Sequence, residues 1–162
     1  MIGRRVGIAG FTMVELVVAV GIIALLSGMG MAVFLDFRDK RVGIADMKVV
    51  EQTLREAQRK ALAGERPVEC GSFPLSGYQV VVESDAVVMS AVCSGAVPPE
   101  TRVEMNDVTL SSTLGTIVFG SVKGGATAAT ITVCVPEINY HYQVEVGSAG
   151  SIEVSDELPG GC

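Results

Sequence analysis

The chain opens with a long run of apolar residues. Residues 11–35 include a single charged side chain, Glu15. A helix of about 25 residues rises about 37 Å, at about 1.5 Å per residue. That length is enough to cross a hydrocarbon core of about 30 Å. The run therefore predicts a transmembrane helix over residues 11–35.

The pattern changes to one-sided after a charged patch at residues 36–41. Apolar residues then recur at steps of three and four, which predicts an amphipathic helix. Glu51–Arg55 and Glu56–Lys60 have the four-residue spacing of favourable ion pairs. No proline interrupts residues 11–66, so we expect one continuous helix that ends near Gly64. Its amphipathic part should span residues 36–64, and its apolar face should consist of Met47, Val50, Leu54, Ala57 and Ala61.

Alternating positions dominate the rest of the chain, residues 65–162, and predict a β-rich domain. Strands are expected at residues 78–82, 86–92, 102–110, 116–119, 130–135, 140–146 and 151–154. The tail, residues 155–162, is acidic and expected to be a loop. A long helix followed only by strands predicts an α+β fold, in which the helix covers an antiparallel sheet.

The ends of the apolar run do not suit an ordinary anchor. Arg4 and Arg5 precede it, which places this end in the cytoplasm and the β-rich domain outside. A secretory signal carries its small-residue cleavage site after the apolar region, whereas here Gly10 comes before it. Glu15 also needs an explanation, because a carboxylate in the centre of a membrane helix costs about 2.5–3.5 kcal/mol.

At these residues the chain resembles the type IV pilin and pseudopilin superfamily. The similarity consists of Gly10, then residues 11–16 (Phe-Thr-Met-Val-Glu-Leu), then the apolar helix. It implies that residues 1–10 are a leader, that prepilin peptidase cuts between Gly10 and Phe11, and that the Phe11 amine is then methylated. It also implies assembly into a helical filament with other pilins or pseudopilins, where Glu15 would pair with the Phe11 amine of a neighbouring subunit.

The C-terminal part resembles H-type minor pseudopilins of type II secretion and FimT-like minor pilins. The shared pattern covers residues 116–154: a strand with Val-Phe-Gly at 118–120, a glycine loop, Thr-Ile-Thr-Val at 130–133, and a final hairpin before Ser-Ile-Glu-Val at 151–154.

Charge and cysteine content narrow the function classes. The formal net charge is −6, which argues against a broad nucleic-acid surface. Four cysteines lie on the exported side, where an even number favours disulfides. Four cysteines allow three connectivities. We predict Cys70–Cys93, closing the first hairpin onto the helix exit, and Cys134–Cys162, attaching the tail to a strand.

No enzyme motif, cofactor or metal site is predicted. His141, the only histidine, alternates with tyrosines and should lie on the polar face of its strand. The spacing of the cysteines lacks a Cys-x-x-Cys pair, which argues against zinc. Asp156 and Glu157 alone are too few ligands for calcium, so a solvated tail is the favoured interpretation.

Together these observations predict a minor pseudopilin in an envelope-spanning filament of type II secretion. The chain would cross the bacterial inner membrane once, contact lipid and an inner-membrane assembly platform, and expose its C-terminal domain in the periplasm or outside the cell. Two alternatives stay open: a FimT-like minor pilin of a type IV pilus, acting in pilus biogenesis or DNA uptake, and a major pilin.

Processing offers a direct test of this interpretation. The mature protein should begin at N-methylated Phe11, and Gly10→Val should block cleavage because the peptidase must accommodate a residue without a bulky side chain. Mass spectrometry of the purified protein measures both. An intact leader, or cleavage after residue 35, would contradict the interpretation.

Overall fold

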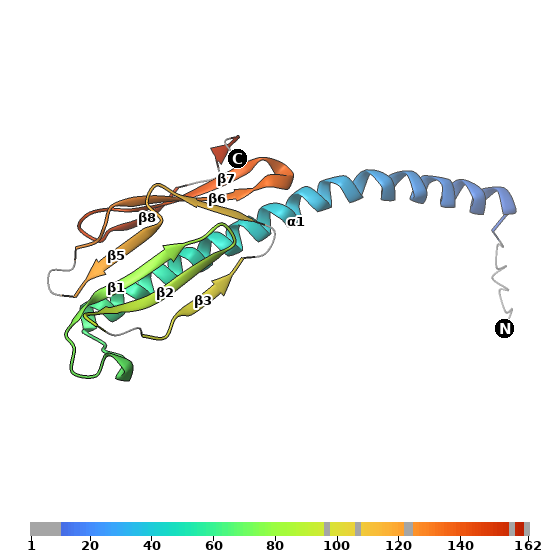
Figure 1. Cartoon of the computed structure of the whole chain (residues 1–162). Helices are drawn as coiled ribbons and strands as arrows, with labels where there is room; N and C mark the ends of the chain where they lie inside the picture. The colour runs from blue at the N-terminus through green and yellow to red at the C-terminus, as the bar shows by residue number, and fades with distance from the viewer. Residues whose placement is uncertain (1–10, 96–97, 106–107, 122–124, 156–157, 161–162) are drawn as a thin grey trace, which may run out of the picture. The chain divides into compact units, whose positions relative to one another are not determined.

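One long helix and a set of antiparallel strands make up the described chain (Figure 1). The computed structural model describes residues 11–95, 98–105, 108–121, 125–155 and 158–160; the side chains of residues 28–33, 36, 158 and 159 lie outside this description. The helix, α1, spans Met13–Ala63. The chain divides into two compact units, Met1–Phe37 and Arg38–Cys162.

The first unit contains the N-terminal part of α1. Its described side chains are exposed on every side of the helix, including large apolar ones such as Val17, Ile23 and Leu26. Over the residues whose side chains are described, no helix reaches the length and apolarity that a membrane crossing requires.

The second unit begins with the amphipathic part of α1. All five predicted face residues are buried, and four of them, Val50, Leu54, Ala57 and Ala61, have no exposed surface. Both predicted ion pairs form, with Arg55 Nε 2.7 Å from Glu51 Oε1 and Lys60 Nζ 3.0 Å from Glu56 Oε1. The one-sided pattern in the sequence is therefore confirmed as the packing face of the helix.

The helix ends where the sequence predicts. Gly64 has φ of +64°, a left-handed conformation that glycine adopts without strain. The N–H of Gly64 donates to the carbonyl of Ala61, and the N–H of Glu65 donates to the carbonyl of Lys60. A short 3-10 turn, η1 (Val68–Cys70), follows and leads into the first strand.

The strands form two antiparallel sheets. Sheet A has the order β3-β2-β1-β5 and sheet B the order β4-β6-β7-β8, with the short β9 also pairing with β7. A second 3-10 turn, η2 (Pro136–Ile138), joins β6 to β7. The bounds are β1 (Leu75–Val82), β2 (Ala86–Cys93), β3 (Thr101–Glu104), β4 (Thr109–Ser112), β5 (Thr116–Gly120), β6 (Ala129–Val135), β7 (Tyr140–Val146), β8 (Ile152–Val154) and β9 (Leu158–Pro159).

The α+β class and most strands are confirmed, and two predictions are wrong. The single strand expected at residues 102–110 is two strands, β3 and β4, which belong to different sheets. The tail is not entirely loop, because β9 pairs with Tyr140 and His141 of β7. In both places the ladder partner lies far away in the sequence, and local alternation carries no information about it.

Alternate residues of β6 and β7 face a common core with α1. Ile131, Val133 and Val144 are fully buried there, next to Phe119 and Ile117 of β5. The helix approaches sheet B closely at Gly43. A Cβ atom added to Gly43 would lie 2.5 Å from Val135 Cγ2 and 2.9 Å from Tyr142 Cε2. Glycine is therefore required there by contact with the sheet.

Replacing Gly43 tests this close approach. Gly43→Ala should gain about 1 kcal/mol of helix propensity but cost about 1–3 kcal/mol through overpacking, so the domain should become less stable. Thermal unfolding of the purified chain measures the difference. Gly21→Ala is the control, since nothing lies within 4 Å of a Cβ added there. An unchanged or higher melting temperature for Gly43→Ala would contradict the packing.

Candidate functional site

The first turn of α1 contains the residues predicted to act in filament assembly. Phe11 is exposed and precedes the helix, while Gly10 lies outside the described residues. Thr12 Oγ1 accepts a hydrogen bond of 3.3 Å from the N–H of Glu15, and the Thr12 carbonyl accepts one from the N–H of Leu16. Thr12 is therefore the N-cap residue of α1.

This cap is a structural feature that the sequence interpretation missed. Thr12-Met13-Val14-Glu15 has the Thr-x-x-Glu spacing of a capping box, and that motif was visible in the sequence. Only the Thr12 side of the box forms. The Glu15 carboxylate is exposed and makes no hydrogen bond or ion pair within the described part of the chain. Its charge thus remains available to a partner, and the positive pole of the helix N-terminus favours a carboxylate in this turn.

The structure describes three of the four cysteines. Cys70 and Cys93 form a disulfide with a Cα–Cα distance of 5.8 Å, as predicted. It connects η1, just after the helix, to the last residue of β2. Cys134 of β6 is also disulfide-bonded. Its predicted partner, Cys162, lies outside the described residues, so the Cys134–Cys162 pairing stays a prediction.

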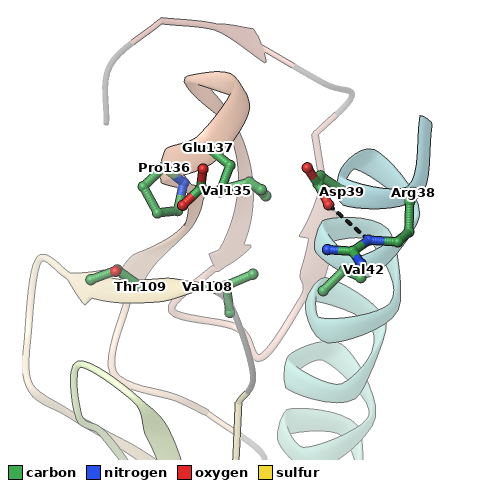
Figure 2. Close-up of a pocket in the computed structure, with 8 residues that line it drawn as sticks. All are labelled: Arg38, Asp39, Val42, Val108, Thr109, Val135, Pro136 and Glu137. Atoms are coloured by element: carbon green, nitrogen blue, oxygen red, sulfur yellow. Dashed lines mark hydrogen bonds and ion pairs between the residues drawn. The ribbon is translucent and has the colours of Figure 1, made fainter. Parts of the chain in front are cut away.

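A recess of about 390 Å³ lies between the start of the amphipathic helix and sheet B. Figure 2 shows α1 on one side of the recess, and the end of β6 and the start of β4 on the other. An ion pair of 3.1 Å joins Arg38 Nε and Asp39 Oδ1 at its rim. Polar and charged side chains line the recess together with apolar ones. The lining residues are Arg38, Asp39, Val42, Val108, Thr109, Val135, Pro136 and Glu137.

The far end of α1 is attached to sheet A through polar contacts. The Tyr78 hydroxyl donates a 2.8 Å hydrogen bond to the Glu65 carbonyl, and Lys60 Nζ lies 6.0 Å from the Tyr78 ring centre. Burial raises the pKa of the Tyr78 hydroxyl, and the hydrogen bond to Glu56 raises the pKa of Lys60. Both groups therefore keep their neutral-pH protonation states, which maintains the attachment.

His141 and the acidic tail provide no metal site that the structure describes. His141 is half-buried between Cys134 of β6 and Leu158 of β9, and its Nδ1 has no hydrogen-bond partner among the described residues. No group of three His, Cys, Asp or Glu residues is placed to hold a metal ion within the described ranges. Asp156 and Glu157, the weak calcium candidates, lie outside them.

Comparison with known proteins gives no assignment. No protein-family model, no curated protein and no solved structure matches this chain. The resemblance to pilins therefore depends on the short motifs quoted above and on the physical properties of the residues.

The disulfides can be tested by peptide mapping without reduction. We expect one linked peptide containing Cys70 and Cys93 and another containing Cys134 and Cys162. The double variant Cys70→Ser/Cys93→Ser should lose about 3 kcal/mol of unfolding free energy, because the bond restricts the unfolded chain. A Cys70–Cys162 or Cys93–Cys134 peptide, or an unpaired Cys162 thiol, would contradict this pairing.

Proposed function

We propose that this chain is a pilin-like subunit of an envelope-spanning filament, in the form of a minor pseudopilin of type II secretion. One observation carries the proposal. A single helix, α1, exposes large apolar side chains in its first part and buries an apolar face against its own β-domain in the second. The first part therefore needs a partner from outside the domain.

Lipid and neighbouring helices are the two partners that this role supplies. In the inner membrane, acyl chains would cover the apolar run of residues 11–35 before assembly, and the helices of adjacent subunits would cover it afterwards. Exposed apolar surface of this extent is typical of an interaction or membrane site. The Cys70–Cys93 disulfide suits a domain on the oxidising, periplasmic side.

The first turn of α1 supports the same role. Prepilin peptidase would expose the Phe11 amine, next to the Thr12 cap, and the Glu15 carboxylate has no partner within the described residues. A charge in an apolar bundle is tolerable only when it is paired. Glu15 of one subunit and the Phe11 amine of the next would neutralise each other, which would set the axial register as the assembly platform adds subunits.

Two alternatives use the same architecture. Uptake of DNA by a FimT-like minor pilin needs basic residues in the β-domain. From Pro67 to Cys162 the sequence has only Arg102 and Lys123 as basic residues against eleven acidic ones. Arg102 is further surrounded by Glu83, Asp85 and Glu104. This charge distribution disfavours DNA, whereas a major pilin remains compatible with it.

The conservative variant Glu15→Gln removes the negative charge of residue 15 and keeps a side chain of the same size in the first turn of α1. Gln is also accepted at this position of a capping box, so the helix should be retained. Without the negative charge, we expect entry into filaments to fall at least about tenfold, since the amine would be left unpaired. Immunoblots of sheared filaments measure incorporation, and export of a folded substrate measures secretion.

Thr12→Ser is the matched control, because serine preserves the cap. It should assemble normally. Normal incorporation of Glu15→Gln would refute the pairing role. A chain that never enters filaments, even as the wild type, would refute the proposed function.

A further inference from the structure

The solvent-facing side of α1 in the second unit carries a row of basic residues. Arg41, Lys48, Arg55 and Arg59 are all exposed. The first three are seven residues apart, which places them on one side of the helix, about 10.5 Å from one to the next. We call these four residues the basic row. It lies opposite the buried face that contains Val50 and Leu54.

Two members of the basic row have no ionic partner within the described chain. Arg55 is bound to Glu51 and donates to the carbonyl of Ile152. Lys48 and Arg59, in contrast, form no ion pair among the described residues. Gln52, Arg55, Glu56 and Arg59 also line a shallow recess of about 370 Å³. Arg55 and Arg59 of the row thus bring positive charge to this recess, which suits it to receive an acidic group.

Sheet B carries a complementary feature. Glu145 of β7 and Glu153 of β8 are directly opposite each other in the ladder, and both are exposed. Like charges in this arrangement destabilise a sheet, and neither residue forms an ion pair with any described residue. Both line a recess of about 320 Å³ together with Thr130 and Ser151. We call Glu145 and Glu153 the acidic pair; a cation from another molecule would relieve its repulsion.

The two features form no ion pair with each other among the described residues. Val144, Val146 and Ile152, the neighbours of the acidic pair, are buried in the core shared with α1. Because side chains alternate across a strand, the acidic pair faces away from the helix. Arg55 of the basic row reaches the edge of sheet B at the Ile152 carbonyl, whereas Lys48 lies on the exposed side of the helix. One molecule therefore presents unpaired charges of both signs, and repeated head-to-tail contacts between copies build rings or open helical assemblies.

From this arrangement we propose that the basic row of one copy docks against the acidic pair of the next copy. This inference rests on the proposed filament role and adds that copies of this chain lie next to one another. A second copy is the occupant that we infer, because each copy supplies both the basic row and the acidic pair.

Charge reversal in the full-length chain, expressed with its own assembly system, tests the contact. Lys48→Glu/Arg59→Glu and Glu145→Lys/Glu153→Lys should each lower recovery in sheared filaments at least about tenfold, since like charges would then face each other. A chain that carries all four changes should recover to within about threefold of the wild type, because the charges are complementary again. Arg66→Glu and Glu100→Lys are controls, as both positions are exposed and form no ion pair among the described residues.

A second measurement keeps the inference testable if a reversed variant misfolds. Arg59→Cys combined with Glu153→Cys should give a ladder of disulfide-linked oligomers in filaments, and neither single variant should give one. No ladder, or failure of the four-change chain to recover, would overturn the contact while leaving the filament role in place. A subunit present once at the filament tip would give that result, because no second copy would lie next to it.

Two further outcomes would also overturn the proposed contact. Reversed variants that assemble normally but lose binding to duplex DNA or to anionic vesicles would overturn the contact in favour of those partners. A wild-type chain absent from all filaments would remove the proposed function together with the contact.

Discussion

The packing of one helix face against two sheets is the interaction on which the rest of the structure depends. Val50, Leu54 and Ala57 have no exposed surface, and Ile131, Val133 and Ile117 meet them from both sheets. Deleting one such side chain typically costs about 2–5 kcal/mol, a large part of the stability of a domain of this size. Because this face faces inward, the basic row faces solvent.

Periodicity in the sequence was sufficient for the helix and most strands. The three-and-four spacing from Met47 to Ala61 identified the buried face, and the four-residue spacing identified both ion pairs. Gly64 ends the helix for a local reason, and so does the turn at residues 147–150 (Gly-Ser-Ala-Gly) before β8, where the N–H of Gly150 donates to the carbonyl of Gly147. These features depend on neighbours within a few residues, which a linear pattern records.

Features that depend on distant partners were not predictable in this way. The break between β3 and β4 and the pairing of β9 with β7 are set by the tertiary arrangement. The same holds for the need for glycine at residue 43, which follows from Val135 and Tyr142. At the candidate site, Glu15 was recognised from a motif, whereas the Thr12 cap was overlooked although its spacing was visible. The opposed carboxylates of Glu145 and Glu153 needed the strand register.

The central claim is that the first part of α1 is covered by the equivalent helices of other filament subunits. The most direct measurement is a cryo-electron microscopy structure of filaments that contain the native chain. The account predicts that residues 13–27 lie inside a helical bundle, with the Glu15 carboxylate within salt-bridge distance of the Phe11 amine of an adjacent subunit. A filament in which these residues lie on the outer surface, or in which Glu15 faces solvent, would contradict it.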